Sequence, residues 1–147
     1  MFKEDFIFLK DYENKFKKIV RSIITYSNFE LSEPIWESFL VHVRNLYEFF
    51  YKYNKSDKVY AKNFITSWNI KNYDKKIDLF NIKINGYLNH LSYNRVEDKN
   101  FIEWDPLFLF NHFKLLIIKF LDELEEINKD YLIDDLISIR EELRTFK

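Results

Sequence analysis

The chain has 147 residues, enough for one domain with a substantial buried core. It is 47% hydrophobic and 20% aromatic, which argues against disorder, and one glycine with two prolines provides too little turn chemistry for an all-β protein. We therefore expect an all-α fold, a single helical domain spanning residues 1–147 and built as a bundle of four to five main helices.

The composition also bears on location and partners. The sequence has no cysteine, which removes disulfides, thiolate catalysis and cysteine-ligated zinc. Acidic residues follow Met1 closely where a secretory signal is basic, and the most apolar run, 115–121, contains a lysine and is too short to cross a bilayer. We expect a cytoplasmic protein with no membrane partner.

The charge is nearly balanced overall but uneven along the chain. Residues 1–100 hold 17 Lys and Arg against 13 Asp and Glu, whereas residues 101–147 hold 6 against 11, which together give the net charge of −1. This balance argues against strong non-specific nucleic-acid binding by the whole surface. The uneven distribution indicates either solvated helix faces of different composition or a mildly basic face that could meet phosphate.

Apolar residues recur at helical spacing along most of the chain. The second helix has Ser32 as its N-cap, and the helix that starts at Pro106 has Asp105 in that role. The predicted helices cover residues 2–26, 33–53, 59–68, 74–94, 106–126 and 130–146. The helix over 106–126 is apolar almost all round, which predicts either the central position in the bundle or a second side buried in a partner. We expect a symmetric homodimer.

The helix over 74–94 contains the only glycine of the chain, Gly86. A glycine inside a helix costs roughly 1 kcal/mol against alanine. We therefore expect that the missing side chain of Gly86 allows another helix or a ligand to approach this helix closely. Arg95 falls on the apolar stripe of the same helix, where an unpaired charge is expensive, so we expect an acceptor beside it.

Polar side chains interrupt the second half of this helix and define a candidate site. The candidate catalytic residues are His90 as general acid and base, with Lys83 and Arg95 as phosphate-binding cations. The candidate binding residues are His42, Arg44, Asn45, Asn85, Asn89 and Asn94. Such a set suits phosphodiester chemistry without a metal, and the alternative is a polar seam that fixes helix register.

Metal and cofactor binding have little support in the sequence. One glycine cannot build a glycine-rich phosphate loop. The three histidines lie on three different predicted helices, with no carboxylate at ligand spacing beside any of them. A site formed by His42, His90 and His112 would require all three helices to converge. We expect neither a metal nor a cofactor.

Two segments resemble the HEPN superfamily of small helical bundles. Residues 36–50 read WESFLVHVRNLYEFF, and residues 83–95 read KINGYLNHLSYNR. The resemblance implies a HEPN-like bundle that acts on or binds RNA, because many members are metal-independent ribonucleases that work as dimers, often as toxins or antiphage effectors. Those members carry an arginine a few residues before a histidine on one helix, whereas this sequence has Lys83 before His90, followed by Ile84 where a polar residue is usual.

Two other interpretations remain open from the sequence. The first is a non-catalytic helical module for binding a protein partner or for oligomerisation. The second is a small-molecule or nucleotide pocket lined by the many aromatic side chains, 16 Phe, 10 Tyr and 3 Trp.

Overall fold

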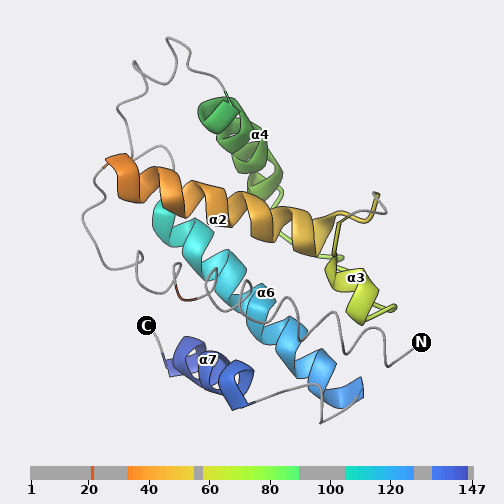
Figure 1. The fold of residues 1–147 in the computed structure, drawn as a ribbon. Helices are drawn as coiled ribbons and strands as arrows, with labels where there is room; N and C mark the ends of the chain where they lie inside the picture. The colour runs from red at the N-terminus through yellow and green to blue at the C-terminus, as the bar shows by residue number, and fades with distance from the viewer. Residues whose placement is uncertain (1–20, 22–32, 55–57, 90–104, 128–133, 146–147) are drawn as a thin grey trace.

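The structure is a computed structural model that describes residue 21 and residues 33–54, 58–89, 105–127 and 134–145. Within these residues every regular element is a helix and none is a strand, which confirms the expected all-α class. The helices of the described residues are α2 (Glu33–Tyr51), α3 (Ala61–Phe64), α4 (Lys76–Asn89), α6 (Pro106–Ile127) and α7 (Asp134–Thr145) (Figure 1). None of these helices is long and apolar enough to cross a membrane.

The start of α6 agrees closely with the sequence pattern. Asp105 precedes Pro106, and its Oδ1 accepts a hydrogen bond of 3.2 Å from the backbone N–H of Phe108, as an N-cap aspartate should. Asp105 has a φ of 47°, in the left-handed region that aspartate tolerates better than most residues. The predicted first helix over 2–26 lies outside the described residues except for Arg21, which is helical and pairs with Glu142 at 3.5 Å.

The short helix predicted over 59–68 is only one turn long. It begins after Tyr60, whose backbone N–H donates to Asn63 Oδ1 at 2.7 Å, and it ends at Ile65, where the backbone becomes extended. Trp68 is still buried, but through a loop, because its indole N–H donates to the carbonyl of Phe50 at 2.9 Å. A tertiary hydrogen bond thus takes the place of the helical turns that the sequence pattern predicted.

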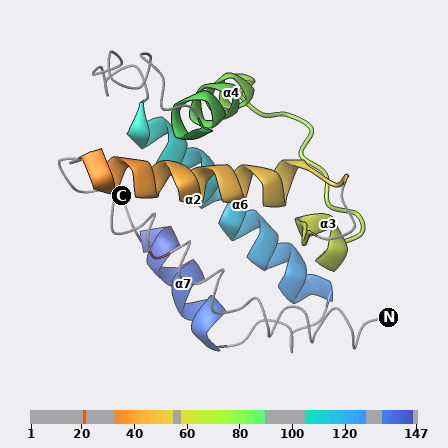
Figure 2. The same cartoon turned by 45° about the horizontal axis from the view of Figure 1, so that its top comes forward.

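Helix α6 occupies the central position that its apolar pattern predicted. It lies between α2 and α7 in both views of the ribbon (Figures 1 and 2). Its buried residues are Leu109, Phe110, Phe113, Leu116, Ile117, Phe120, Leu121 and Leu124. Not all of its apolar surface is covered, however, because Leu107 and Leu115 are each 64% exposed.

Phe120 of α6 is the centre of the aromatic part of the core. Its ring centroid lies 5.3 Å from that of Phe49, 6.0 Å from Phe50, 6.3 Å from Phe64 and 5.7 Å from Trp68, in each case near edge-to-face. Such pairs add roughly 0.5–1.5 kcal/mol each beyond the area they bury. They tie α2, α3 and the loop after α3 to α6.

Helix α7 is held on α6 by apolar contacts and by one buried cation. Arg140 is 7% exposed, and it donates to Asp122 at 2.9 Å and to Glu125 at 3.0 Å. Arg144 reaches the same Asp122 carboxylate at 2.6 Å. The buried arginine of the described structure is therefore on the last helix, whereas Arg95, for which a partner was expected, lies outside the described residues.

Helix α4 crosses α2 in the opposite direction (Figures 1 and 2). Gly86 on this helix is exposed to solvent. A Cβ added at Gly86 would meet no atom within 4 Å. Among the described residues no other helix approaches Gly86 closely, so that part of the expectation is wrong, because the buried stripe of α4 (Ile77, Phe80, Ile84) faces the other way. Leu79 and Ile82, each 68% exposed, accompany Gly86 on the outer side.

Candidate functional site

The structure describes only part of the polar cluster expected around His90. His90, Asn94 and Arg95 lie outside the described residues, as does the side chain of Asn89 at the end of α4. Lys83 and Asn85 are both half-buried on α4. Since residues two apart on a helix diverge by about 200°, these two side chains leave α4 on nearly opposite sides.

The three candidate residues on α2 also point in different directions. The hydroxyl of Tyr47 donates to Asp78 of α4, which marks the side of α2 that faces α4. Arg44 lies about 60° around the helix from Tyr47 and is half-buried, whereas His42 lies about 140° away. Asn45 is exposed. Helical geometry therefore groups Arg44, but not His42 or Asn45, with the α4 side.

His42 is nevertheless an unusual residue. Its Nδ1 is buried and has no hydrogen-bond partner. Burial lowers the pKa of His42 below its ordinary value, because desolvation penalises the charged imidazolium. A neutral histidine with an unpaired nitrogen reduces stability locally, and no neighbouring contact in the described structure gives it a chemical role.

A different polar group lies where α2, α4 and α6 meet, and we call it the tyrosine–histidine cluster: Tyr47, Tyr51, Tyr73, Asp78 and His112. The Asp78 carboxylate accepts hydrogen bonds from Tyr47 at 2.7 Å and from Tyr73 at 3.0 Å. The Tyr51 hydroxyl lies 2.5 Å from His112 Nε2. The rings of Tyr47 and Tyr51 stack with centroids 4.9 Å apart, and Tyr51 lies at the same distance from Tyr73.

Burial sets the protonation states within this cluster. It raises the pKa of Tyr47 and Tyr51 well above their ordinary value, and the hydrogen bond and the charge of Asp78 add to the effect at Tyr47. Burial lowers the pKa of His112, although the charges of Asp74 and Asp78 oppose the shift. Tyr47 and Tyr51 therefore remain hydroxyl donors at neutral pH, and Nε2 of a neutral His112 can accept a hydrogen bond from the Tyr51 hydroxyl.

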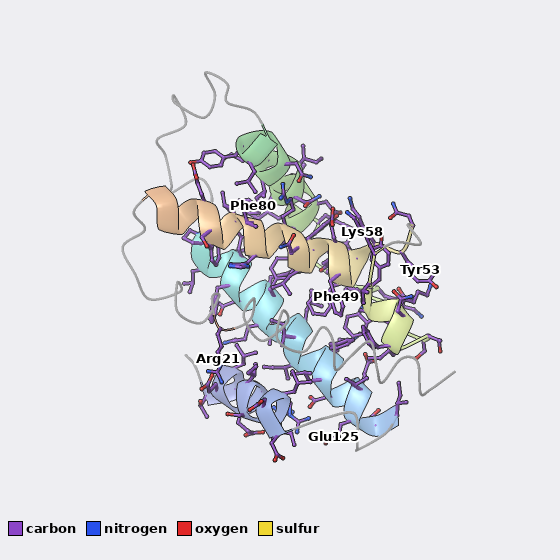
Figure 3. All side chains as sticks on the ribbon, viewed as in Figure 1. Arg21, Phe49, Tyr53, Lys58, Phe80 and Glu125 are labelled. Carbon is purple, nitrogen blue, oxygen red and sulfur yellow. The ribbon has the colours of Figure 1, made fainter. Side chains whose placement is uncertain are left out.

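A pocket of about 240 Å³ adjoins the cluster at the C-terminal end of α2, and we call it the α2-end pocket. Its lining residues are Phe50, Tyr51, Lys52, Tyr53, Lys62, Trp68, Asn69, Ile70 and Tyr73. Tyr51 and Tyr73 thus belong both to the pocket wall and to the hydrogen-bonded cluster behind it. Tyr53 is 60% exposed at the rim, close to α3 (Figure 3).

The chain around this pocket is strongly basic. Residues 52–76 contain seven lysines and two aspartates, a surplus of five positive charges in a protein whose net charge is −1. Two of the lysines are paired with acidic groups, Lys58 with Glu48 at 3.1 Å and Lys76 with Asp105 at 3.4 Å. Lys52 and Lys62 line the pocket itself, and Lys62 Nζ lies 5.7 Å from the centroid of the Tyr53 ring.

The floor of the pocket is fixed from α6. Lys119 Nζ lies 4.2 Å from the centroid of the Trp68 ring and donates to the carbonyl of Asn69 at 3.2 Å. Phe120 packs edge-on against Trp68. The arrangement offers aromatic walls, two ammonium groups and the amide of Asn69 around one small cavity, which is chemistry for binding rather than for proton transfer.

The tyrosine–histidine cluster and the α2-end pocket were difficult to predict from the sequence. Tyr51 and His112 are 61 positions apart, and Tyr47 and Asp78 are 31 apart, so no local spacing links them. The high density of lysine over 52–76 was the available signal, and it was hidden by the balanced charge of the whole chain.

The described residues contain no group of three or more histidine, cysteine, aspartate or glutamate side chains that could hold a metal ion. In the cluster, Nε2 of His112 is already engaged by Tyr51. Comparison of the chain with protein-family models, curated proteins and solved structures finds no match.

Proposed function

We propose that this protein binds RNA, with the α2-end pocket and its lysines as the contact surface. The observation that carries the proposal is the coincidence of an aromatic-walled pocket with the most basic segment of the chain. Proteins that bind single strands combine a cationic surface that follows the phosphates with aromatic rings on which bases stack. Lys52 and Lys62 would supply the first element, and Tyr51, Tyr53 and Tyr73 the second.

The resemblance to the HEPN superfamily supports RNA as the ligand. The first similar segment, 36–50, lies on α2, and the second begins on α4, which packs against α2. In the catalytic version of the proposal, His90 transfers protons while Lys83 and Arg95 stabilise the phosphate, in a toxin or antiphage setting. The competing version is a non-catalytic binding or oligomerisation module.

A homodimer is the second part of the proposal. Four large apolar side chains on the outside of α4 and α6 support it: Leu79, Ile82, Leu107 and Leu115, each at least 64% exposed. Large contiguous apolar patches mark surfaces where proteins meet partners, and in a dimer these side chains would form such a patch. Sedimentation velocity at micromolar concentration should give the mass of two chains, and a single 18.3 kDa species would contradict the dimer.

RNA binding is tested by fluorescence anisotropy with a labelled single-stranded RNA. Lys62→Ala should weaken binding and reduce the slope of log affinity against log salt by about 0.7, the value for one lost phosphate contact to a single strand. The matched control is Lys114→Ala on α6, because Lys114 Nζ lies 5.8 Å from the Phe110 ring, much as Lys62 lies near Tyr53. Equal losses for the two variants, or no binding by the unmodified protein, would refute the proposed contact surface.

Cleavage is tested separately by incubating the protein with the same RNA in the presence of EDTA. Cutting that disappears in His90→Ala, while RNA binding persists, would support the catalytic version. Intact RNA bound by the unmodified protein would favour the non-catalytic module.

A further inference from the structure

We propose that the α2-end pocket is a subsite for a single unpaired base, and that His112 and Asp78 are positioning residues that hold its tyrosine walls. This inference rests on the proposed RNA binding and narrows it from RNA in general to single strands. It also assigns a role to His112, which does not line the pocket.

The size of the cavity favours one base. At about 240 Å³ it is smaller than the roughly 300–1,000 Å³ pockets that enclose drug-sized ligands. A group with the dimensions of one ring system fits, with its sugar and phosphate left outside near the lysines of the rim. In a duplex the base edges are paired and both faces are stacked, so a paired base cannot enter such a cavity without leaving the helix.

The walls of the pocket are held in place from behind. The Tyr73 hydroxyl is bonded to Asp78, and the Tyr51 hydroxyl is bonded to His112. The His112 ring in turn lies between neighbouring aromatic rings, with centroids 5.8 Å from Phe108 and 5.3 Å from Phe113. Tyr51 and Tyr73 are therefore each held at the backbone and at the hydroxyl, and an aromatic surface that is already ordered loses less conformational entropy when a base stacks on it.

The polar groups at the rim suit a nucleotide. Asn69 lines the pocket, and its amide side chain can both donate to and accept from a base edge. Its backbone carbonyl is fixed by Lys119, so the position of this residue is defined. Lys52 and Lys62 lie on the same rim, within reach of the phosphates that flank an inserted base.

The experiment compares one 12-nucleotide RNA, labelled at its end, as a single strand and annealed to its complement. The single strand should bind about 5- to 150-fold more tightly, the range expected for stacking one base on an aromatic side chain. Equal affinity for both forms, with Lys62 still required, would overturn the base subsite and leave RNA binding intact. Absence of binding to either form would overturn the proposed function as well.

The positioning role is tested by a double-mutant cycle on the affinity for the single strand. Tyr51→Phe keeps the ring but removes the hydroxyl, and His112→Phe removes the acceptor, so each should weaken binding several-fold. The double variant should bind no worse than either single variant, because both remove one shared hydrogen bond. Tyr60→Phe is the control, since it loses a hydroxyl bond of 3.1 Å to Asn54 and does not line the pocket.

Thermal unfolding of each variant identifies any loss of RNA affinity that results from destabilisation of the fold. Unchanged RNA affinity in a folded Tyr51→Phe would overturn the positioning role of His112. If His112→Phe does not fold, a comparison of the RNA affinities of Tyr51→Phe and Tyr60→Phe still tests whether the hydrogen bond between Tyr51 and His112 contributes to binding.

Discussion

Replacement of Gly86 by alanine should stabilise the protein. Gly86 lies in α4 with a negative φ, is exposed, and an added Cβ would touch nothing within 4 Å, so the substitution has no steric cost. Alanine is favoured over glycine by about 0.8–1.0 kcal/mol in a helix interior. Because Gly86 is close to the end of α4 at Asn89, we expect a gain of about 0.5–1 kcal/mol.

The gain is measured by urea unfolding followed by circular dichroism, with thermal unfolding as a second readout. For a protein of this size, 1 kcal/mol corresponds to roughly 2–4 °C in Tm. Gly86→Val provides a graded comparison, since a β-branched residue has a lower helix propensity and should give a smaller gain. A loss of stability in Gly86→Ala would mean that another helix packs against this position, and would refute the reasoning from open space.

Other predictions concern the core and pH dependence. Arg140→Ala should lower the free energy of unfolding by about 2–3 kcal/mol, which is less than for a fully buried ion pair because Asp122 is 42% exposed. Arg140→Met should lower the free energy of unfolding by less than Arg140→Ala, because methionine keeps an apolar side chain where the arginine stem is buried. Phe120→Ala should cost roughly 3–5 kcal/mol in the same urea assay, and Phe120→Leu clearly less; equal losses would contradict the role of the ring contacts. The pKa values of His42 and His112 are lower in the folded protein than in the unfolded chain, so on acidification the unfolded chain binds protons at a higher pH. The two neutral histidines therefore make their full contribution to the free energy of unfolding above about pH 6.5, and this contribution is lost as the pH falls through their folded-state pKa values. His42→Leu should reduce that fall in Tm between pH 7 and pH 5.5, and an unchanged pH profile would argue against the burial of His42.

The main helices were predictable because each has a periodic apolar stripe, and the helix from Pro106 also has a local start signal. Asp105 and Pro106 marked the start of α6, and both perform the expected roles. The region around Trp68 was not predictable in the same way. Its burial was foreseen, but its spacing from Phe64 suggested a helix, whereas a bond to the carbonyl of Phe50 holds it in a loop. A pattern of burial alone does not distinguish these two backbones.

The candidate site was harder to predict than the fold. The polar residues that stood out were neighbours along one helix, and three of them, His90, Asn94 and Arg95, lie outside the described residues. The cluster that the structure does show depends on the crossing of α2, α4 and α6, which places Tyr51 beside His112. Gly86 is a second example, because a single glycine in a helix shows that a side chain is missing but not whether another part of the protein occupies that space.

The pocket shares its floor with the hydrophobic core, and this has an evolutionary consequence. Phe50 and Trp68 line the cavity and also pack on Phe120, so a substitution there should alter both the proposed ligand contacts and folding. Tyr53, Lys62 and Asn69 line the same cavity but are exposed, and selection can change them at little cost in stability. Divergence in ligand preference among descendants of this protein should therefore accumulate at the rim, while the floor stays aromatic.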